Sequence, residues 1–166
     1  GIDSFKIEGR MKTALYVATV ARTYRKAIDD YKKDPALYEK NMEWYKAEIG
    51  KCTYREFTTG FYFGKPTTDS QIYDSNTYVK NYTYLGTVEE VREDGCCRIE
   101  QKNKFSVGEQ IEIMKPDGRN VLVTVKGITD EDGNAMESAP HPKQILWVDL
   151  GSEVSPYDIL RRSEME

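Results

Sequence analysis

The sequence predicts an α+β chain in which a helical N-terminal segment precedes a small six-stranded β-barrel. Apolar residues recur at helical spacing between residues 13 and 49. After Tyr84, six short apolar runs are separated by glycine-containing turns, a pattern typical of a small closed barrel. Between these two patterns, residues 51–84 show no clear periodicity. We therefore expect an N-terminal region over residues 1–66 and a barrel domain over residues 67–166.

The first element, residues 1–12 with the sequence GIDSFKIEGRMK, is interpreted as a short buried strand that ends in a glycine-broken turn. Phe5 and Ile7 are apolar at alternate positions, as a half-buried strand requires. Glu8 and Arg10 then place an acid and a base beside a flexible backbone, which is a common way of building a site before a helix. In one alternative these charges form a solvated helix entrance. In another, the Ile-Glu-Gly-Arg run is a tag-cleavage sequence from recombinant expression.

Two helices are predicted next. Thr13 is the expected N-cap of the first, and Asp34-Pro35 both ends that helix and starts the second, which runs to about Ile49 before Gly50. The apolar face of the first helix consists of Ala14, Val17, Ala18, Ala21, Tyr24, Ile28 and Tyr31. The opposite face carries Arg22, Lys26, Asp29 and Lys33. We expect the apolar face to pack against the second helix or against another copy of the chain.

Aromatic residues are grouped in two places. Tyrosines recur every seven residues, at positions 24, 31, 38 and 45, and this spacing favours packing between the two helices over a stacking ladder for nucleic-acid bases. Phe61, Tyr62 and Phe63 lie between two glycines in the segment without periodicity. For them, core packing at a domain junction is favoured over a ligand-facing platform.

The barrel strands are predicted at residues 85–92, 97–101, 110–115, 121–128, 144–150 and 158–162. The turns between them contain Asp94-Gly95, Pro116-Asp117-Gly118, Asp132-Gly133-Asn134 and Gly151-Ser152.

The net charge of −4 is unevenly distributed. Residues 1–66 carry 13 Lys/Arg against 9 Asp/Glu, whereas residues 67–166 carry 11 against 19. The barrel is therefore unsuited to binding a phosphate backbone unaided, since such binding needs clustered positive charge. No apolar run approaches the length of a membrane span, so we expect no membrane partner. Cytoplasm is the expected location by default, in keeping with cysteines that suit a reducing compartment.

The remaining residues with chemical potential favour ordinary roles. The three cysteines, Cys52, Cys96 and Cys97, suit a reducing compartment better than a disulfide framework, and neighbouring cysteines alone cannot enclose a metal. His141 lies between two prolines in a predicted loop, and one histidine excludes a multi-histidine metal site. No phosphate-binding glycine loop, nucleophile elbow or zinc spacing is present, so we predict no metal site.

Two motifs resemble a known family. GIDSFKIEGRMK followed by YVATVARTYRKAID, and REFTTGFYFG at residues 55–64, strongly resemble segments of the collagenase-like peptidases, peptidase family U32. The resemblance extends more weakly over the barrel, where VGEQIEIMKPDG is similar to strands of the small barrel domain of translation elongation factors. It also argues against the tag, because a tag would not be followed by a helix that matches the family.

The resemblance implies that the chain is the C-terminal part of a longer parent protein, beginning near the last strand of a barrel of alternating strands and helices. Glu8 and Arg10 would then be catalytic-site residues at the mouth of that barrel. Lys12, Arg55, Phe61, Tyr62 and Phe63 are the residues expected to bind a substrate or partner. Relatives that hydroxylate RNA hold an iron–sulfur cluster on four cysteines, so such a cluster is expected in the parent and no cofactor is expected in this chain.

The function expected from the resemblance is an accessory, substrate- or partner-recognising part of a collagenase-like peptidase or tRNA uridine 5-hydroxylation protein. The chain alone is expected to be inert. The alternative is a protein-interaction module of a true protease acting on collagen-like or other proteins. Expected partners are the missing catalytic barrel, tRNA or protein bound through the parent, and a second copy of the chain.

Overall fold

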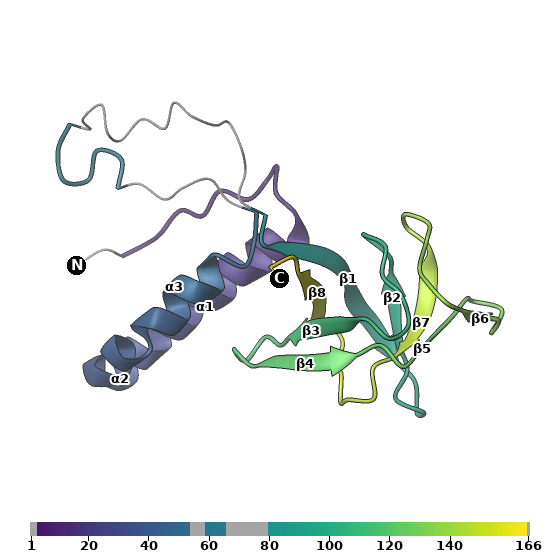
Figure 1. Ribbon diagram of the computed structural model, residues 1–166. Coiled ribbons are helices and arrows are strands. Elements are labelled where there is room, and N and C mark those ends of the chain that lie inside the picture. Colours follow the sequence, from purple (N-terminus) through teal and green to yellow (C-terminus); the bar gives the residue numbers. More distant parts are fainter. Residues whose placement is uncertain (1–2, 54–58, 66–79, 166) are drawn as a thin grey trace.

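The computed structural model describes residues 3–53, 59–65 and 80–165. Helices α1 (Ala14–Lys33), α2 (Pro35–Lys40) and α3 (Met42–Ile49) lie together on one side of a curled antiparallel sheet (Figure 1). The chain thus has a helical N-terminal part and a strand-rich C-terminal part, an α+β arrangement. None of the helices in the described ranges is long and apolar enough to cross a membrane.

Local signals define the helix ends as predicted. The Thr13 hydroxyl accepts a hydrogen bond from the Tyr16 N–H at 3.2 Å, and the Asp34 carboxylate accepts one from the Ala36 N–H at 2.9 Å. Gly50 follows the last residue of α3. The predicted second helix is, however, divided into α2 and α3 at Asn41. The side-chain amide of Asn41 donates to the Asp30 carboxylate of α1 at 2.9 Å, a contact between helices that local sequence does not reveal.

The predicted face of α1 packs only in part. Leu15 is buried and packs with Met114 and Ile159 of the sheet, and Arg22 is also buried. On the predicted packing face, by contrast, Val17, Tyr24 and Tyr31 are 41%, 45% and 56% exposed. The prediction is therefore confirmed for Tyr31, which meets Tyr38 of α2, and wrong for Val17 and Tyr24. The buried face instead carries polar and charged side chains whose partners lie on other elements. Pairing with another copy of the chain stays a prediction.

The tyrosine spacing does reflect packing between helices. The rings of Tyr38 and Tyr45 stack with centroids 5.6 Å apart, and Tyr31 meets Tyr38 edge-on at 5.6 Å. The Tyr45 hydroxyl donates to the Asp30 carboxylate at 2.6 Å, which joins α3 to α1. The interpretation as packing is confirmed for these three tyrosines, whereas Tyr24 instead stacks on Phe5 at 6.4 Å.

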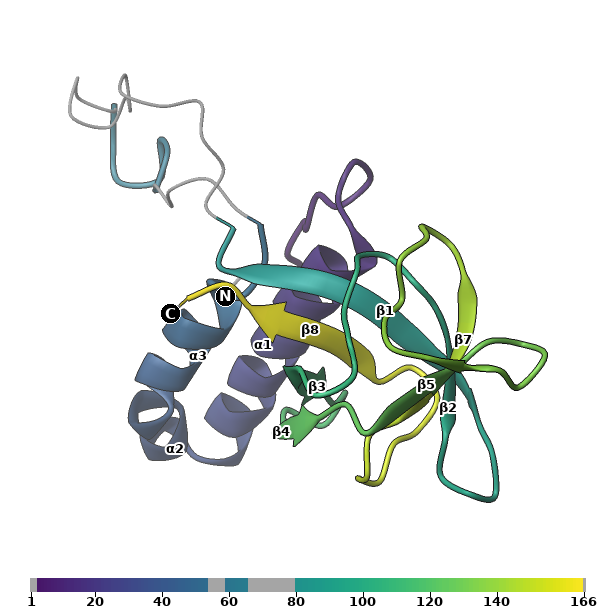
Figure 2. The same ribbon diagram turned by 45° about the vertical axis from the view of Figure 1, so that its right-hand side comes forward.

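The described part of the chain has eight strands, not the six predicted. They are β1 (Tyr82–Val91), β2 (Cys97–Glu100), β3 (Gln110–Met114), β4 (Asn120–Thr124), β5 (Gly127–Thr129), β6 (Ala135–Met136), β7 (Ile145–Asp149) and β8 (Ile159–Ser163). Their order in the sheet is β4-β3-β8-β1-β2-β7-β5-β6, and Figure 2 shows β4, β3, β8 and β1 of this order side by side. Every pairing is antiparallel.

The strand count differs for two reasons: β6 was not predicted, and the predicted strand at 121–128 changes partner in its middle. Up to Thr124 it pairs with β3, and the Val125 N–H still donates to the Glu109 carbonyl at 2.9 Å. The Lys126 N–H donates to the Asp149 carbonyl at 2.8 Å, after which β5 pairs with β7. One continuous segment therefore bonds to strands on two different parts of the sheet. The similarity to translation-factor barrels stays a prediction.

The core lies inside the curled sheet. Alternate side chains of β1, β2, β3, β7 and β8 point inward and lose their contact with water, which supplies most of the driving force for folding. The inward residues with no exposed surface include Leu85, Val88, Ile99, Ile113, Leu146, Val148 and Leu160.

Candidate functional site

The N-terminal turn places Glu8 and Arg10 together at the surface. The Glu8 carboxylate accepts a hydrogen bond from the Arg10 backbone N–H at 3.0 Å and forms an ion pair with Lys6 at 3.6 Å. The Glu8 side chain is 69% exposed. Lys12 closes the turn by donating its N–H to the Gly9 carbonyl at 2.9 Å, and its ammonium lies 5.3 Å from the centre of the Tyr16 ring. An acid and a base are thus adjacent in a water-accessible turn.

The residues before this turn do not form the expected buried strand. Residues 3–9 have no regular secondary structure, and Phe5 and Ile7 are 60% and 37% exposed. The segment lies against α1, where Phe5 stacks on Tyr24 and Gly9 approaches Val17. A Cβ atom on Gly9 would come within 2.7 Å of the Val17 side chain, so only glycine fits this contact without a shift.

The aromatic segment is exposed. Phe61, Tyr62 and Phe63 are 79%, 74% and 81% exposed, and Tyr62 and Phe63 meet edge-on at 4.9 Å. The favoured prediction of core packing is therefore wrong for these three rings. Arg55 and Phe57 lie outside the described residues. Whether Lys12 and the three aromatic residues bind a substrate or partner stays a prediction.

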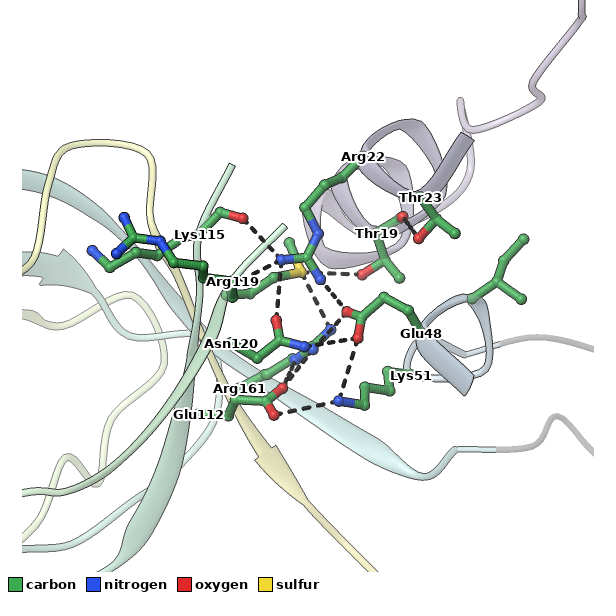
Figure 3. Close-up of polar contacts among 12 residues, drawn as sticks. Thr19, Arg22, Thr23, Glu48, Lys51, Glu112, Lys115, Arg119, Asn120 and Arg161 are labelled. Atoms are coloured by element: carbon green, nitrogen blue, oxygen red, sulfur yellow. Dashed lines mark hydrogen bonds and ion pairs between the residues drawn. The ribbon is translucent and has the colours of Figure 1, made fainter. Parts of the chain in front are cut away.

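Among the described residues, a buried polar arrangement lies between the helices and the sheet, and the sequence did not predict it. The Glu48 carboxylate of α3 accepts hydrogen bonds from Arg22 of α1 and, at 2.7 Å, from Arg161 of β8. Arg161 also bonds to Glu112 of β3, through Nε at 2.6 Å. Lys51 lies 3.3 Å from both carboxylates. Figure 3 shows these five side chains, here called the junction network, converging from α1, from α3 and the turn that follows it, and from the sheet.

Uncharged groups complete the hydrogen bonding of the junction network. Asn120 of β4 donates to Glu48 at 2.8 Å and accepts from Arg22 at 3.0 Å. Arg22 also donates to the Lys115 carbonyl at 2.8 Å. The side chains of Arg22, Glu48 and Arg161 are 5%, 2% and 0% exposed. Buried charges are tolerated when they are paired and hydrogen-bonded in this way.

Burial and the pairing of opposite charges set the charge state of the junction network. Burial alone would raise the pKa of Glu48, but Arg161 and Arg22 more than offset it and hold that pKa below the ordinary value of 4.5. Burial lowers the pKa of Arg22, and Glu48 partly offsets this effect. Glu48 is therefore ionised at neutral pH and fully bonded, so it is unsuited to accepting a proton from a substrate. The network joins elements and performs no evident chemistry.

The cysteines do not form a reactive or metal-binding site. Burial raises the pKa of Cys52 to about 11 and that of Cys97 to about 12, which keeps both thiols protonated. The described residues contain no group of three His, Cys, Asp or Glu side chains that could hold a metal ion. An iron–sulfur cluster on four thiolates does not fit this chain, which has three cysteines. His141 is exposed in a loop, as predicted.

Comparison with known proteins assigns the chain to a family. The model of peptidase family U32 matches residues 1–72, and the model of the peptidase family U32 C-terminal domain matches residues 80–161. The chain belongs to peptidase family U32. This U32 chain is 38% identical over 165 residues to tRNA hydroxylation protein P1 of Bacillus subtilis, covering 99% of the chain and 39% of that relative.

Other U32 relatives carry two kinds of name. tRNA hydroxylation protein P of Escherichia coli is 31% identical over 165 residues, with 98% of this chain and 35% of the relative covered. A protein named collagenase from Porphyromonas gingivalis is 26% identical over 164 residues, with 98% of the chain and 45% of the relative covered. The chain thus spans less than half the length of these relatives.

A solved structure also matches. It is the C-terminal domain of a protein described as a U32 peptidase from Geobacillus thermoleovorans, at 30% identity and a TM-score of 0.45. The match covers 48% of this chain and 99% of that domain.

Proposed function

We propose that this chain serves as the C-terminal, substrate- or partner-recognising part of a U32 protein in tRNA uridine 5-hydroxylation. The observation that supports this most is the 38% identity to tRNA hydroxylation protein P1, which extends over the helices and the sheet alike. Under this proposal, residues 1–66 complete the catalytic region of the parent and residues 67–166 form the accessory barrel-like domain.

The geometry supports an accessory role. The junction network ties α1, α3, β3 and β8 into one unit, and its charges are already paired with one another. A unit of this kind can present surfaces in a fixed arrangement while the reaction takes place elsewhere. The chain alone is accordingly proposed to be inert.

Glu8 and Arg10 are proposed to lie at the edge of the parent's site. Their adjacency in an exposed turn suits a hydrogen-bonding acid beside an anion-binding base. Arginine is suited to a carboxylate or phosphate because its planar guanidinium makes paired hydrogen bonds. Any iron–sulfur cluster of the parent would need ligands from outside this chain, because the thiols described here do not fit one.

A second candidate rests on the relative named collagenase, which is similar over 98% of this chain. In that case the sheet would act as a protein-interaction module of a protease acting on collagen-like or other proteins. The identity is lower, at 26% against 38% for the tRNA hydroxylation relative, and we therefore favour RNA modification.

The test is a comparison of tRNA nucleosides from cells with and without the gene of the parent protein. We expect loss of 5-hydroxyuridine derivatives on deletion and their return when the wild-type gene is restored. A matched complementation with the parent carrying Arg10→Ala is expected to restore them poorly, whereas Lys32→Ala, on the exposed end of α1, serves as the control. Unchanged tRNA together with loss of protein degradation would favour the protease instead.

A further inference from the structure

A groove separates α1 from the nearby end of the sheet, beside the junction network. Its volume is about 440 Å³, which is within the range of ordinary ligand sites. Its apolar wall is formed by two small residues of α1 and two buried residues of the sheet: Ala18, Ala21, Met114 and Ile159. The small side chains leave room for a flat group against the helix.

Tyr157 stands at the edge of this groove in an unusual conformation. Its φ angle is 75°, in the left-handed region that favours glycine, and its side chain is 79% exposed. An exposed ring contributes little to the core, so folding alone gives no reason for a tyrosine at a position where glycine would be less strained. Such strain tends to be retained at binding sites.

The backbone around Tyr157 is held firmly. The Tyr157 N–H donates to the Val88 carbonyl of β1 at 2.8 Å. The next residue, Asp158, is buried, and its carboxylate accepts hydrogen bonds from the Ser155 N–H at 2.9 Å and from Lys115 at 2.7 Å. A buried ion pair thus fixes the turn that presents the ring.

The charged side chains that line the groove are cationic, although each is paired with an acid outside it. Among the described residues that line the groove they are Arg22, which is bonded to Glu48, and Arg25, which is bonded to Asp29. Arg25 is 58% exposed and bonds to Asp29 on its own helix, so its guanidinium is reachable from water. The Nε atom of Arg22 is a buried donor that has no hydrogen-bond acceptor among the described residues. An anionic ligand that carries a flat ring matches these features together.

We propose that this groove binds a single-stranded segment of RNA, with one unstacked base on the Tyr157 ring and an adjacent phosphate near Arg25. The inference rests on the proposed function, which supplies RNA as the class of partner, and it names the surface that would hold it. Aromatic rings beside cationic side chains are the common means of holding unpaired bases. An apolar peptide is less suited, because it would use neither arginine.

The test measures binding of a fluorescein-labelled oligouridylate to the 166-residue chain by fluorescence anisotropy. We expect binding to weaken as the salt concentration rises from ~50 to ~200 mM. The variant Arg25→Gln should bind more weakly and with a shallower salt dependence.

Tyr157→Gly should weaken binding about ten-fold, because stacking on that ring is lost. Tyr157→Phe should keep the affinity, since the ring remains. The control Tyr31→Ala removes another exposed tyrosine, on the far part of α1, and should leave the affinity unchanged.

Stability measurements separate binding from folding. Tyr157→Gly should unfold at the same or a higher urea concentration than the wild type, because glycine accepts the positive φ angle.

Equal affinity of the wild type and Tyr157→Gly would overturn the inference, as would binding of an apolar peptide but not of the oligouridylate. If cells lacking the parent lose tRNA hydroxylation while Tyr157→Gly binds RNA normally, the proposed function holds and this groove is the wrong site. Weaker binding by Tyr157→Gly with unchanged cellular tRNA would support the groove and contradict the proposed function.

Discussion

Glu48 at the end of α3 accepts a hydrogen bond from Arg161 of β8 at 2.7 Å, although 113 residues separate them in the sequence. Glu48 also accepts a hydrogen bond from Arg22, so a single carboxylate compensates two buried guanidinium groups. The helical part and the sheet are therefore joined by ionic contacts as well as by apolar packing. A substitution at Glu48 should consequently lower the stability of the helices and the sheet together.

Replacing Glu48 by Gln should strongly destabilise the fold. The substitution keeps the shape of the side chain but leaves Arg22 and Arg161 without their shared counter-charge, and breaking a buried pair in this way costs about 3–5 kcal/mol. Urea unfolding followed by circular dichroism at neutral pH measures the effect. The control is Glu43→Gln, because the Glu43 side chain is 88% exposed and should contribute less than about 0.5 kcal/mol. Equal midpoints for the two variants would show that the junction network does not stabilise the fold.

The penalty of Glu48→Gln should depend on pH. The pKa of Glu48 in the folded chain lies below 4.5, so the ionised form is favoured by folding. This contribution is fully present above pH 4.5 and is lost as the pH falls through the lower folded pKa. Urea midpoints of wild type and Glu48→Gln should therefore converge below pH 4.5. A difference that stays constant from neutral to acid pH would contradict the assigned charge state.

Features specified by neighbouring residues could be predicted from the sequence, whereas features that depend on distant contacts could not. Thr13 and the Asp34-Pro35 step cap helices through bonds within three residues, and both appear in the structure. The sequence assigns Arg22 to the face of the first helix opposite the apolar one, and it does not reveal that Arg22 is buried, because its partners Glu48 and Asn120 lie on other elements. The division of residues 121–128 into two strands likewise depends on which distant strand each half meets.

The candidate site shows the same limit. The motif around Glu8 and Arg10 identified the family, but no sequence pattern indicates the groove beside Tyr157, since its walls come from α1, β3 and the turn before β8. A tyrosine after a proline reveals nothing about a positive φ angle. The exposure of Phe61, Tyr62 and Phe63 was also missed, because aromatic residues are buried in most proteins.

The phenol of Tyr45 should ionise at a higher pH than that of an ordinary tyrosine. Burial and then the hydrogen bond to Asp30 raise the pKa of its phenol to about 12. Because the neutral phenol is favoured in the fold, this stabilisation is complete below pH 10 and is lost as the pH rises towards 12. Ultraviolet absorbance during an alkaline titration should show a late phase that Tyr45→Phe removes. Tyr157→Phe, which removes an exposed phenol, should leave that phase in place; its loss in this control would contradict the assignment.

Two glycines in the sheet should respond differently to alanine. A Cβ atom on Gly86 of β1 would lie 3.1 Å from the Glu100 carbonyl oxygen and 3.2 Å from the Ile99 side chain. Because the obstacle includes backbone, Gly86→Ala should destabilise the fold by about 1–3 kcal/mol. On Gly127 of β5 the nearest atom would be 3.9 Å away, an ordinary contact, so Gly127→Ala should be neutral or stabilising by up to about 1 kcal/mol. The midpoints of urea unfolding measure both effects. A larger loss of stability for Gly127→Ala than for Gly86→Ala would show that the packing of β1 against β2 has been misassigned.

The three thiols should react with a thiol reagent in a set order. Cys96 is partly exposed, whereas Cys52 and Cys97 are buried with pKa values raised to about 11 and about 12. Since the thiolate is the reactive form, the native chain at mildly alkaline pH should show one faster reaction, and the other two thiols should react only as the chain unfolds. Cys96→Ser should abolish the faster phase, and guanidinium should make all remaining thiols reactive. Rapid reaction of every thiol in the native chain would mean that Cys52 and Cys97 are accessible, and their assignment as buried, protonated thiols would then fail.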